Sequence, residues 1–336
     1  MKIDTIRDIA ERAGVSVTTV SRVLNNRPDV SRATQEKVRR VMKESHFVGN
    51  ANARGLKRAD QEMVAVIVRG RQNPFLSALA EEMLQCAAPG KAPFALEYID
   101  EQADEFHHAL MLTHSRRASG LIFLGSRIDD RCHAIDGVNL PMVFATVTTQ
   151  GTPMARASSV SMDDRAMACQ AIEALLQRGH EKIAVFGGDR QGTDSLALRA
   201  LGVEDAFHHR GMQLEEGRYV ETRFTLSDAY EAALSFFRRC PDTDAAFCMS
   251  DTVALGVIRA LVDLGRRVPQ DVSVLGIDGI EMGRYSLPRL STVAQPIGKI
   301  ARESVAVLTE MMESGAHARH VTVPASLVLR ESVREA

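Results

Sequence analysis

The chain has 336 residues, of which 45% are hydrophobic and 25% are charged, so we expect a globular protein of two or three domains rather than a disordered chain. The first five residues carry no apolar run behind their charge, and no apolar stretch exceeds one buried strand. We therefore expect neither a secretion signal nor a membrane span, and predict a cytoplasmic protein.

The net charge of −2 conceals a strong asymmetry along the chain. Residues 1–60 contain 13 Lys and Arg against 7 Asp and Glu, a net charge of +6. The remaining residues contain 28 basic against 36 acidic side chains, a net charge of −8. A small basic segment attached to a large acidic body predicts a polyanionic partner for the first segment.

Three short helical patterns occupy residues 1–46. Thr5 starts the first at the spacing of a capping box, and Gly14 ends it. Ser16 caps the second pattern and Ser31 caps the third. A helix, a turn around a glycine and a second helix form the helix-turn-helix plan, so we expect a small all-α domain here.

Residues 47–62 are typical of a linker with weak helical propensity, in which Ala53 and Leu56 are the recurring apolar residues. From residue 63 to residue 336, strand and helix patterns alternate. This βαβ rhythm predicts parallel sheets with helices on both faces, in two lobes rather than one. The expected strands are 63–68, 94–99, 120–124, 141–144, 182–186, 245–249 and 272–277, and expected helices include 75–88, 164–178, 227–239 and 252–264.

Several motifs occur in a fixed order along the chain. The first segment contains TIRDIA from Thr5, AGVS from Ala13 and TVSRVLN from Thr19. The body contains, in order, the motifs Asn73-Pro74-Phe75, Arg178-Gly179-His180, Arg199 with Gly202, Ser250-Asp251, Gly276-Ile277-Asp278, Leu290-Ser291-Thr292-Val293 and Gln295-Pro296. Together they resemble the lactose-repressor (LacI/GalR) family over nearly the whole chain.

This resemblance implies a periplasmic-binding-protein-like (type I) body that binds an effector and dimerises. The chain of such a body crosses between its two lobes three times. Lobe one would then comprise approximately residues 63–161 and 294–324, and lobe two approximately residues 162–293 and 325–336.

The second helix of the first segment has the side chains of a DNA recognition helix. Thr18 and Arg22 share one helix face, Val17 offers methyl groups to a thymine methyl, and Arg22 can bind a guanine bidentately. Small polar residues at helix ends suit phosphate contacts, although helix capping alone would also explain Ser16 and Ser31. These are Thr5, Ser16, Thr19, Ser21, Asn25 and Ser31.

The linker resembles the hinge helix of that family, with Leu56 at the position of its wedge leucine. The resemblance implies that Ala53 and Leu56 enter the minor groove and that Asn50 contributes to the same DNA surface. Without the resemblance, Leu56 would be interpreted as an incidental leucine of the linker.

Ligands of open α/β sheets bind beyond the carboxyl ends of the strands, where Phe75, Ser250 and Asp278 are expected. Thr193, Ser195 and Arg199 follow another strand. The resemblance adds Leu76, Asp163, Phe224 and Gln295 to the effector set, with Leu76 standing where a second aromatic residue is frequent. A turn role for Asp278 and a core role for Phe224 remain open.

We expect no enzyme, no cofactor and no metal site. The chain lacks a phosphate-binding loop, a G-x-G-x-x-G turn and a G-x-S-x-G elbow. This counts against a kinase fused to a helix-turn-helix, and the basic first segment counts against a solute-binding transport protein. The pairs His107-His108 and His208-His209 are poor chelates without outside ligands, since helical neighbours point about 100° apart.

The cysteines Cys86, Cys132, Cys169, Cys240 and Cys248 are odd in number and scattered, so neither a disulfide framework nor a zinc site is expected. The prediction is a transcriptional regulator, most simply a repressor, that binds a near-palindromic operator as a homodimer. Its effector is expected to be a sugar, a sugar phosphate or a nucleobase. Whether the effector is an inducer or a corepressor remains open, as does the dimer-facing edge around residues 87–93.

Overall fold

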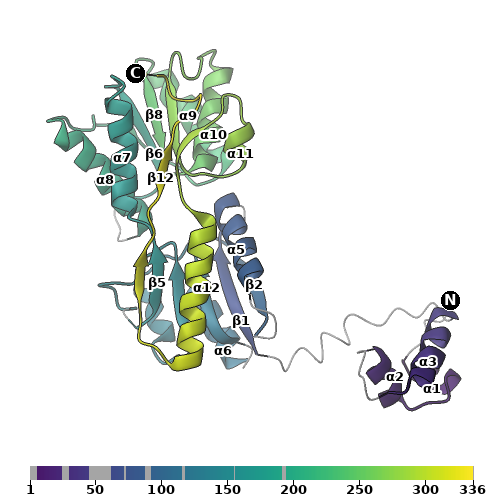
Figure 1. The fold of residues 1–336 in the computed structure, drawn as a ribbon. Helices are drawn as coiled ribbons and strands as arrows, with labels where there is room; N and C mark the ends of the chain where they lie inside the picture. The colour runs from purple at the N-terminus through teal and green to yellow at the C-terminus, as the bar shows by residue number, and fades with distance from the viewer. Residues whose placement is uncertain are drawn as a thin grey trace. The chain divides into compact units, whose positions relative to one another are not determined.

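The computed structural model describes residues 6–24, 30–44, 62–71, 73–87, 92–115, 118–154, 156–190 and 194–335 (Figure 1). The chain divides into two compact units, Met1–Gln61 and Glu62–Ala336.

Within its described residues, 6–24 and 30–44, the first unit contains three helices: α1 (Ile6–Arg12), α2 (Val17–Leu24) and α3 (Arg32–Glu44). Gly14 makes the turn between α1 and α2 with a φ of 58°, a conformation that favours glycine. Ser16 Oγ accepts from the Thr19 amide at 3.1 Å and so caps α2. The apolar faces of the helices meet in a small core of Ile9, Ala10, Ala13, Val20, Val23 and Val38.

Two six-stranded sheets form the second unit. The first has the order β11-β5-β4-β3-β1-β2, and all its neighbours are parallel. Its strands are β1 (Met63–Arg69), β2 (Phe94–Ile99), β3 (Ala118–Leu124), β4 (Met142–Ala145), β5 (Ser158–Ser161) and β11 (His320–Thr322). Its helices are α5 (Pro74–Cys86), α6 (Glu105–His114), the 3₁₀ helix η1 (Asp130–Ile135) and α12 (Ile297–Ser314). We call this sheet with its helices lobe one.

The second sheet has the order β12-β10-β9-β8-β6-β7, with β12 antiparallel to β10 and the other pairs parallel. Its strands are β6 (Ile183–Gly187), β7 (Tyr219–Glu221), β8 (Ala245–Cys248), β9 (Ser273–Asp278), β10 (Ser291–Ala294) and β12 (Ser326–Val328). Its helices are α7 (Asp164–Leu176), α8 (Ser195–His209), α9 (Leu226–Arg239), α10 (Asp251–Asp263) and α11 (Met282–Tyr285). This sheet with its helices is lobe two.

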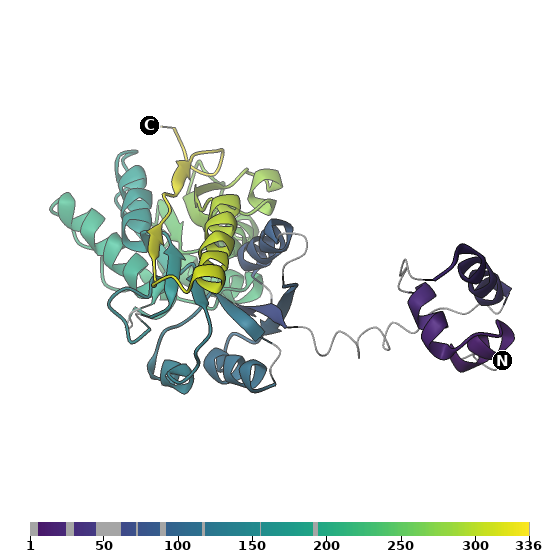
Figure 2. The ribbon, with the colours of Figure 1, turned by 60° about the horizontal axis from the view of Figure 1, so that its bottom comes forward.

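Helices cover both faces of each sheet, as the βαβ pattern predicts. In lobe one, Val64, Val66 and Val68 face α5 and α12, which lie side by side (Figure 1, Figure 2), while Ala65 and Ile67 face the α6 side. In lobe two, α7 pairs with α8 and α9 pairs with α10. Because both faces are covered, the middle residues of inner strands such as β1, β3, β6 and β9 are buried, whereas the edge strands β2 and β7 are only partly buried.

The chain crosses between the lobes three times: after β5, after β10, and between β11 and β12. The predicted fold class is confirmed: a small helical helix-turn-helix unit and a two-lobed α/β unit with parallel sheets. The sequence did not predict β5, β7, β10, β11 or β12, all of which are only three or four residues long.

Candidate functional site

The solvent-facing side of α2 carries the side chains proposed to read DNA bases. Val17 is 41% exposed, and Thr18 and Arg22 are also exposed, whereas Val20 and Val23 face the core. Ser16 and Thr19 join their hydroxyl groups at 2.8 Å at the start of this helix. The face therefore offers methyl, hydroxyl and guanidinium groups to a partner without disturbing the core.

Ser31 caps α3, because its Oγ accepts from the Thr34 amide at 3.3 Å. Several residues proposed for DNA binding lie outside the described residues, as does the side chain of Ser21. Those residues are Thr5, Asn25, Asn50, Ala53 and Leu56.

In the second unit, a cavity of about 360 Å³ lies between the two lobes. It sits at the carboxyl ends of the strands, where open α/β sheets bind their ligands. Arg69 ends β1, Asp100 follows β2 and Thr146 follows β4 on the lobe-one side. Asp278 ends β9 and Gln295 follows β10 on the lobe-two side.

Most residues proposed for the effector site line this cavity: Phe75, Leu76, Ser195, Arg199, Phe224, Ser250, Asp278 and Gln295. Thr193 lies outside the described residues. Asn73 sets the start of α5, because its Oδ1 accepts from the amides of Phe75 and Leu76 at 3.0 and 3.2 Å. Ser250 caps α10 in the same way, accepting from the Val253 amide at 3.2 Å.

Asp163, which the resemblance adds to the effector site, lies elsewhere. Its side chain is exposed, does not line the cavity, and caps α7 by accepting from the Ala166 amide at 2.9 Å. The next residue, Asp164, is buried and points inward to Arg199. The resemblance thus placed the inward-facing carboxylate one residue too early.

Arg199 is held in place by two partners from lobe two. Its Nε donates to Asp164 Oδ1 at 2.8 Å, and its Nη1 donates to the Met249 carbonyl oxygen at 2.6 Å. Both charged side chains are buried. The guanidinium that lines the cavity is therefore balanced by a carboxylate behind it, before any ligand arrives.

Asp278 is the most constrained acidic residue of the cavity. It has a φ of 124°, is buried, and accepts at Oδ1 from Gln295 Nε2 at 2.8 Å. Burial raises the pKa of Asp278 well above its usual range; Arg199 opposes this rise, and the nearby Asp251 carboxyl adds to it.

Asp251 behaves similarly beneath the cavity. Its Oδ2 accepts from the amides of Gly279 and Ile280 at 2.8 and 2.9 Å, yet burial still raises its pKa. Because the pKa of Asp278 is raised, its carboxyl is largely protonated near neutral pH and adds little negative charge to the cavity.

Several residues of lobe one that line the cavity were not predicted from the sequence, among them Arg69, Asp100, Glu101, Ser126 and Thr146. Each ends or closely follows a strand that the sequence did predict, so the strand-end rule could have found them. Gln295 Oε1 is buried without a hydrogen-bond partner in the described structure. This atom is available to a bound molecule.

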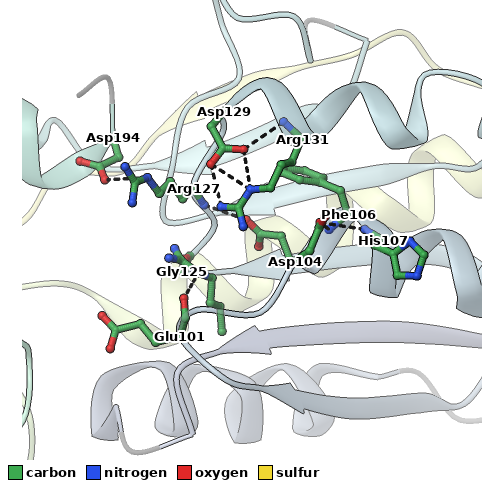
Figure 3. Close-up of polar contacts among 11 residues, drawn as sticks. Glu101, Asp104, Phe106, His107, Gly125, Arg127, Asp129, Arg131 and Asp194 are labelled. Carbon is green, nitrogen blue, oxygen red and sulfur yellow. Dashed lines mark hydrogen bonds and ion pairs between the residues drawn. The ribbon is translucent and has the colours of Figure 1, made fainter. Parts of the chain in front are cut away.

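Polar contacts organise the lobe-one edge of the cavity. Arg69 donates from Nε to the Glu101 carbonyl oxygen at 2.8 Å and from Nη1 to the Gly125 carbonyl oxygen at 3.3 Å. Arg127 reaches across to lobe two, where its Nε lies 3.9 Å from Asp194 Oδ2 at the start of α8 (Figure 3). Ser195 Oγ also donates across the lobes, to the Thr146 carbonyl oxygen at 3.4 Å. The two lobes are thus joined by polar contacts beside the cavity.

Each of the two units matches a known protein family. Residues 5–50 match the family of bacterial regulatory proteins of the lacI type, and residues 172–333 match a periplasmic binding protein-like domain. The HTH-type transcriptional regulator MalR of Clostridium butyricum is 30% identical over 331 residues, which cover 97% of this chain and 98% of that protein.

Two solved structures share the whole architecture. The transcriptional regulator CelR in complex with cellobiose has a TM-score of 0.73 and 27% identity, and covers 98% of this chain and 99% of its own. The lac repressor dimer bound to operator and the anti-inducer ONPF has a TM-score of 0.73 and 26% identity, with the same coverage.

Within the described residues, no helix is long and apolar enough to cross a bilayer. Both the helix-turn-helix unit and the two-lobed unit are consistent with the full-length similarity to transcriptional regulators. The chain therefore belongs to the LacI family of bacterial transcriptional regulators.

Proposed function

We propose that this chain is a cytoplasmic repressor that binds a near-palindromic operator as a homodimer and changes its operator affinity when a small polar effector occupies the cavity between the lobes. The observation that carries the proposal is the combination of two separate surfaces in one chain. One is the exposed face of α2 in the basic first unit, and the other is the polar cavity of the second unit.

The α2 face supports sequence-specific rather than purely electrostatic binding. Arg22 offers two parallel donors to a guanine edge, and Val17 offers methyl groups to a thymine. Ser16 and Ser31 lie at helix starts, where amide groups and the helix dipole attract phosphates. Thr5, Thr19, Ser21, Asn25 and the hinge residues Asn50, Ala53 and Leu56 complete the proposed DNA surface.

The cavity favours an effector with several hydroxyl groups, such as a sugar or a sugar derivative. Arg199 supplies donors, and Gln295 Oε1 and Asp278 supply oxygen atoms that can accept, which matches ligand groups that both donate and accept. Phe224 adds a flat apolar side chain to the wall. The related regulator CelR has been solved in complex with the sugar cellobiose, which supports this class of effector.

A second copy of the chain is proposed to cover an apolar segment at α11. Within six consecutive residues, three large apolar side chains are exposed: Met282 by 51%, Tyr285 by 79% and Leu287 by 89%. Exposed large apolar side chains so close together are typical of an interaction surface. Sedimentation of the wild type and of Tyr285→Arg would test this, with Leu201→Arg on α8 as the control.

The experiment that tests the function has two arms. Selection from random duplexes should yield a site with two-fold symmetry, and a thermal-shift screen of sugars, sugar phosphates and nucleobases should yield an effector. A ligand at 100 times its Kd adds about 2.7 kcal/mol to the free energy of unfolding. Operator binding with and without that ligand then distinguishes an inducer from a corepressor. Enrichment of no sequence at all would contradict the regulator assignment.

A further inference from the structure

A cluster of three metal-binding side chains lies on lobe two, between α7 and α8. Cys169 and Glu173 stand one turn apart on α7, and His209 is the last residue of α8. Cys169 Sγ is 3.7 Å from Glu173 Oε1 and 4.0 Å from His209 Nδ1, and His209 Nδ1 is 3.1 Å from Glu173 Oε1. None of the three lines the effector cavity.

These separations are close to those of three ligands on one zinc ion. Zinc bonds of about 2.3 Å to sulfur and about 2.0 Å to nitrogen or oxygen, at tetrahedral angles, place sulfur about 3.5 Å from the other ligands. The nitrogen and oxygen ligands are then about 3.3 Å apart. The three atoms therefore need to move by only about half an ångström to share an ion.

The packing of the two helices explains why the side chains meet. A Cβ atom on Gly202 of α8 would lie 2.0 Å from the Arg165 carbonyl oxygen of α7, so only glycine permits this approach. One turn further along α8, Asp205 accepts from Arg165 Nε at 2.5 Å and Nη2 at 2.7 Å. This ion pair fixes the register of the helices, and the next turn brings Cys169 and Glu173 beside His209.

The chemistry of the donors selects the ion. A thiolate, an imidazole and a carboxylate form a mixed set that suits Zn²⁺ and is unsuited to Ca²⁺ or Mg²⁺, which prefer oxygen alone. The side chains of His209 and Glu173 are 58% and 36% exposed, so an ion can enter from solvent and keep a water as its fourth ligand.

We propose that Cys169, Glu173 and His209 bind Zn²⁺ on the outer surface of lobe two. The adjacent pair His208-His209 is a poor chelate on one helix, but α7 supplies the two further ligands that His209 needs. The ion would tie α7 to α8, the helices whose first halves carry the buried ion pair between Asp164 and Arg199. The site is independent of the proposed regulatory function, so either can fail alone.

Cobalt(II) titration of the full chain, kept reduced with a phosphine, tests the site directly. The wild type should bind one equivalent of Co²⁺ with a thiolate charge-transfer band and tetrahedral d–d bands, and Zn²⁺ should abolish both. Cys169→Ser should lose the charge-transfer band. His209→Gln and Glu173→Gln should each weaken Co²⁺ binding at least tenfold, since loss of an outer-shell partner alone typically costs 10–100-fold.

Two variants serve as matched controls. His208→Gln changes the neighbouring exposed histidine, and Cys240→Ser changes another half-buried thiol, so both should keep the wild-type spectrum and affinity. Because the His209 side chain is exposed, His209→Gln should fold even if Cys169→Ser does not. A wild type without the charge-transfer band, or a His209→Gln variant with unchanged affinity, would show that the cluster is only an ordinary surface ion pair.

Discussion

Arg199 Nε donates to Asp164 Oδ1 at 2.8 Å, and both side chains are buried in lobe two behind the cavity. Because a carboxylate of the protein already balances this guanidinium, the cavity does not require an anionic effector to neutralise it. The remaining N–H groups of Arg199 can donate to a neutral oxygen, such as a hydroxyl group. An uncharged polyhydroxyl effector can therefore bind Arg199 without supplying a charge of its own.

The same ion pair determines which variant is informative for effector binding. Arg199→Ala would leave Asp164 buried without its partner, a change that typically costs about 3–5 kcal/mol of stability. Asp278→Asn perturbs the folded structure less, because the Asn side chain can still accept a hydrogen bond from Gln295 Nε2. We predict that it weakens effector binding by about two- to tenfold near neutral pH, because the raised pKa leaves Asp278 largely uncharged there and a neutral hydrogen bond is worth about 0.5–1.5 kcal/mol.

Calorimetric titration of the effector identified by the screen measures this loss. The matched control is Asp163→Asn, an exposed helix cap that does not line the cavity, which should bind the effector as the wild type does. Operator affinity without effector should be unchanged in both variants. Wild-type effector affinity in Asp278→Asn would remove Asp278 from the site.

The pH dependence of stability follows from Asp278 and Asp251. Burial raises both pKa values above 3.8, so the folded chain holds protons that the unfolded chain releases. Their stabilising contribution is complete below the unfolded pKa and is lost as the pH rises through the folded pKa. Without effector, Asp278→Asn should therefore raise the free energy of unfolding at about pH 8 by about 1–3 kcal/mol, because a tenfold change in acidity is worth about 1.4 kcal/mol. The gain should shrink toward about pH 5.

Urea unfolding of the wild type and Asp278→Asn at both pH values checks this prediction. A gain that is the same at both pH values would mean that the side chain change acts through packing and not through ionisation.

Arg22→Ala tests base reading by the exposed face of α2. We expect a loss of about 1–3 kcal/mol per half-site on the selected operator and little loss on random duplex DNA. Arg40→Ala, which removes an exposed arginine of α3, should change the binding affinity for the two DNAs equally. Competition binding at fixed salt gives both values, and equal losses for Arg22→Ala on the two DNAs would falsify its role in base reading.

Gly202→Ala tests the close contact between α7 and α8. The added Cβ would lie 2.0 Å from the Arg165 carbonyl oxygen, so the helices must separate, at a cost of about 1–3 kcal/mol or more. Gly137→Ala is the control, because its Cβ would meet nothing within 4 Å. If thermal unfolding of the two variants were alike, the helices would not be held as the structure describes.

The sequence predicted the parts of the fold whose burial follows a simple period. It failed at β5, where Ser158, Ser159 and Ser161 are buried although they are polar. Ser159 Oγ is 2.9 Å from His320 Nδ1, a partner 161 residues away that no local pattern reveals. The three-residue strands β11 and β12 likewise depend on pairing with distant strands.

Residues that line the cavity were predicted where they follow recognisable strands, as with Asp278 and Ser250. The site was misplaced at Asp163 because two acidic residues stand side by side at the start of α7. The first has an extended backbone and caps the helix, whereas the second lies in the helix and points inward to Arg199. Only the tertiary position of Arg199 distinguishes them.

Reciprocal titration tests the proposed control of the DNA-binding face by the cavity most directly. Coupling free energy is the same in both directions, so the factor by which effector changes operator affinity must equal the factor by which operator changes effector affinity. Effector is titrated into the wild type with and without saturating operator, by calorimetry or fluorescence. We predict a difference of about 5–150-fold, equal to the shift measured in the DNA titration. Identical effector affinities in the two titrations would contradict allosteric control by this cavity.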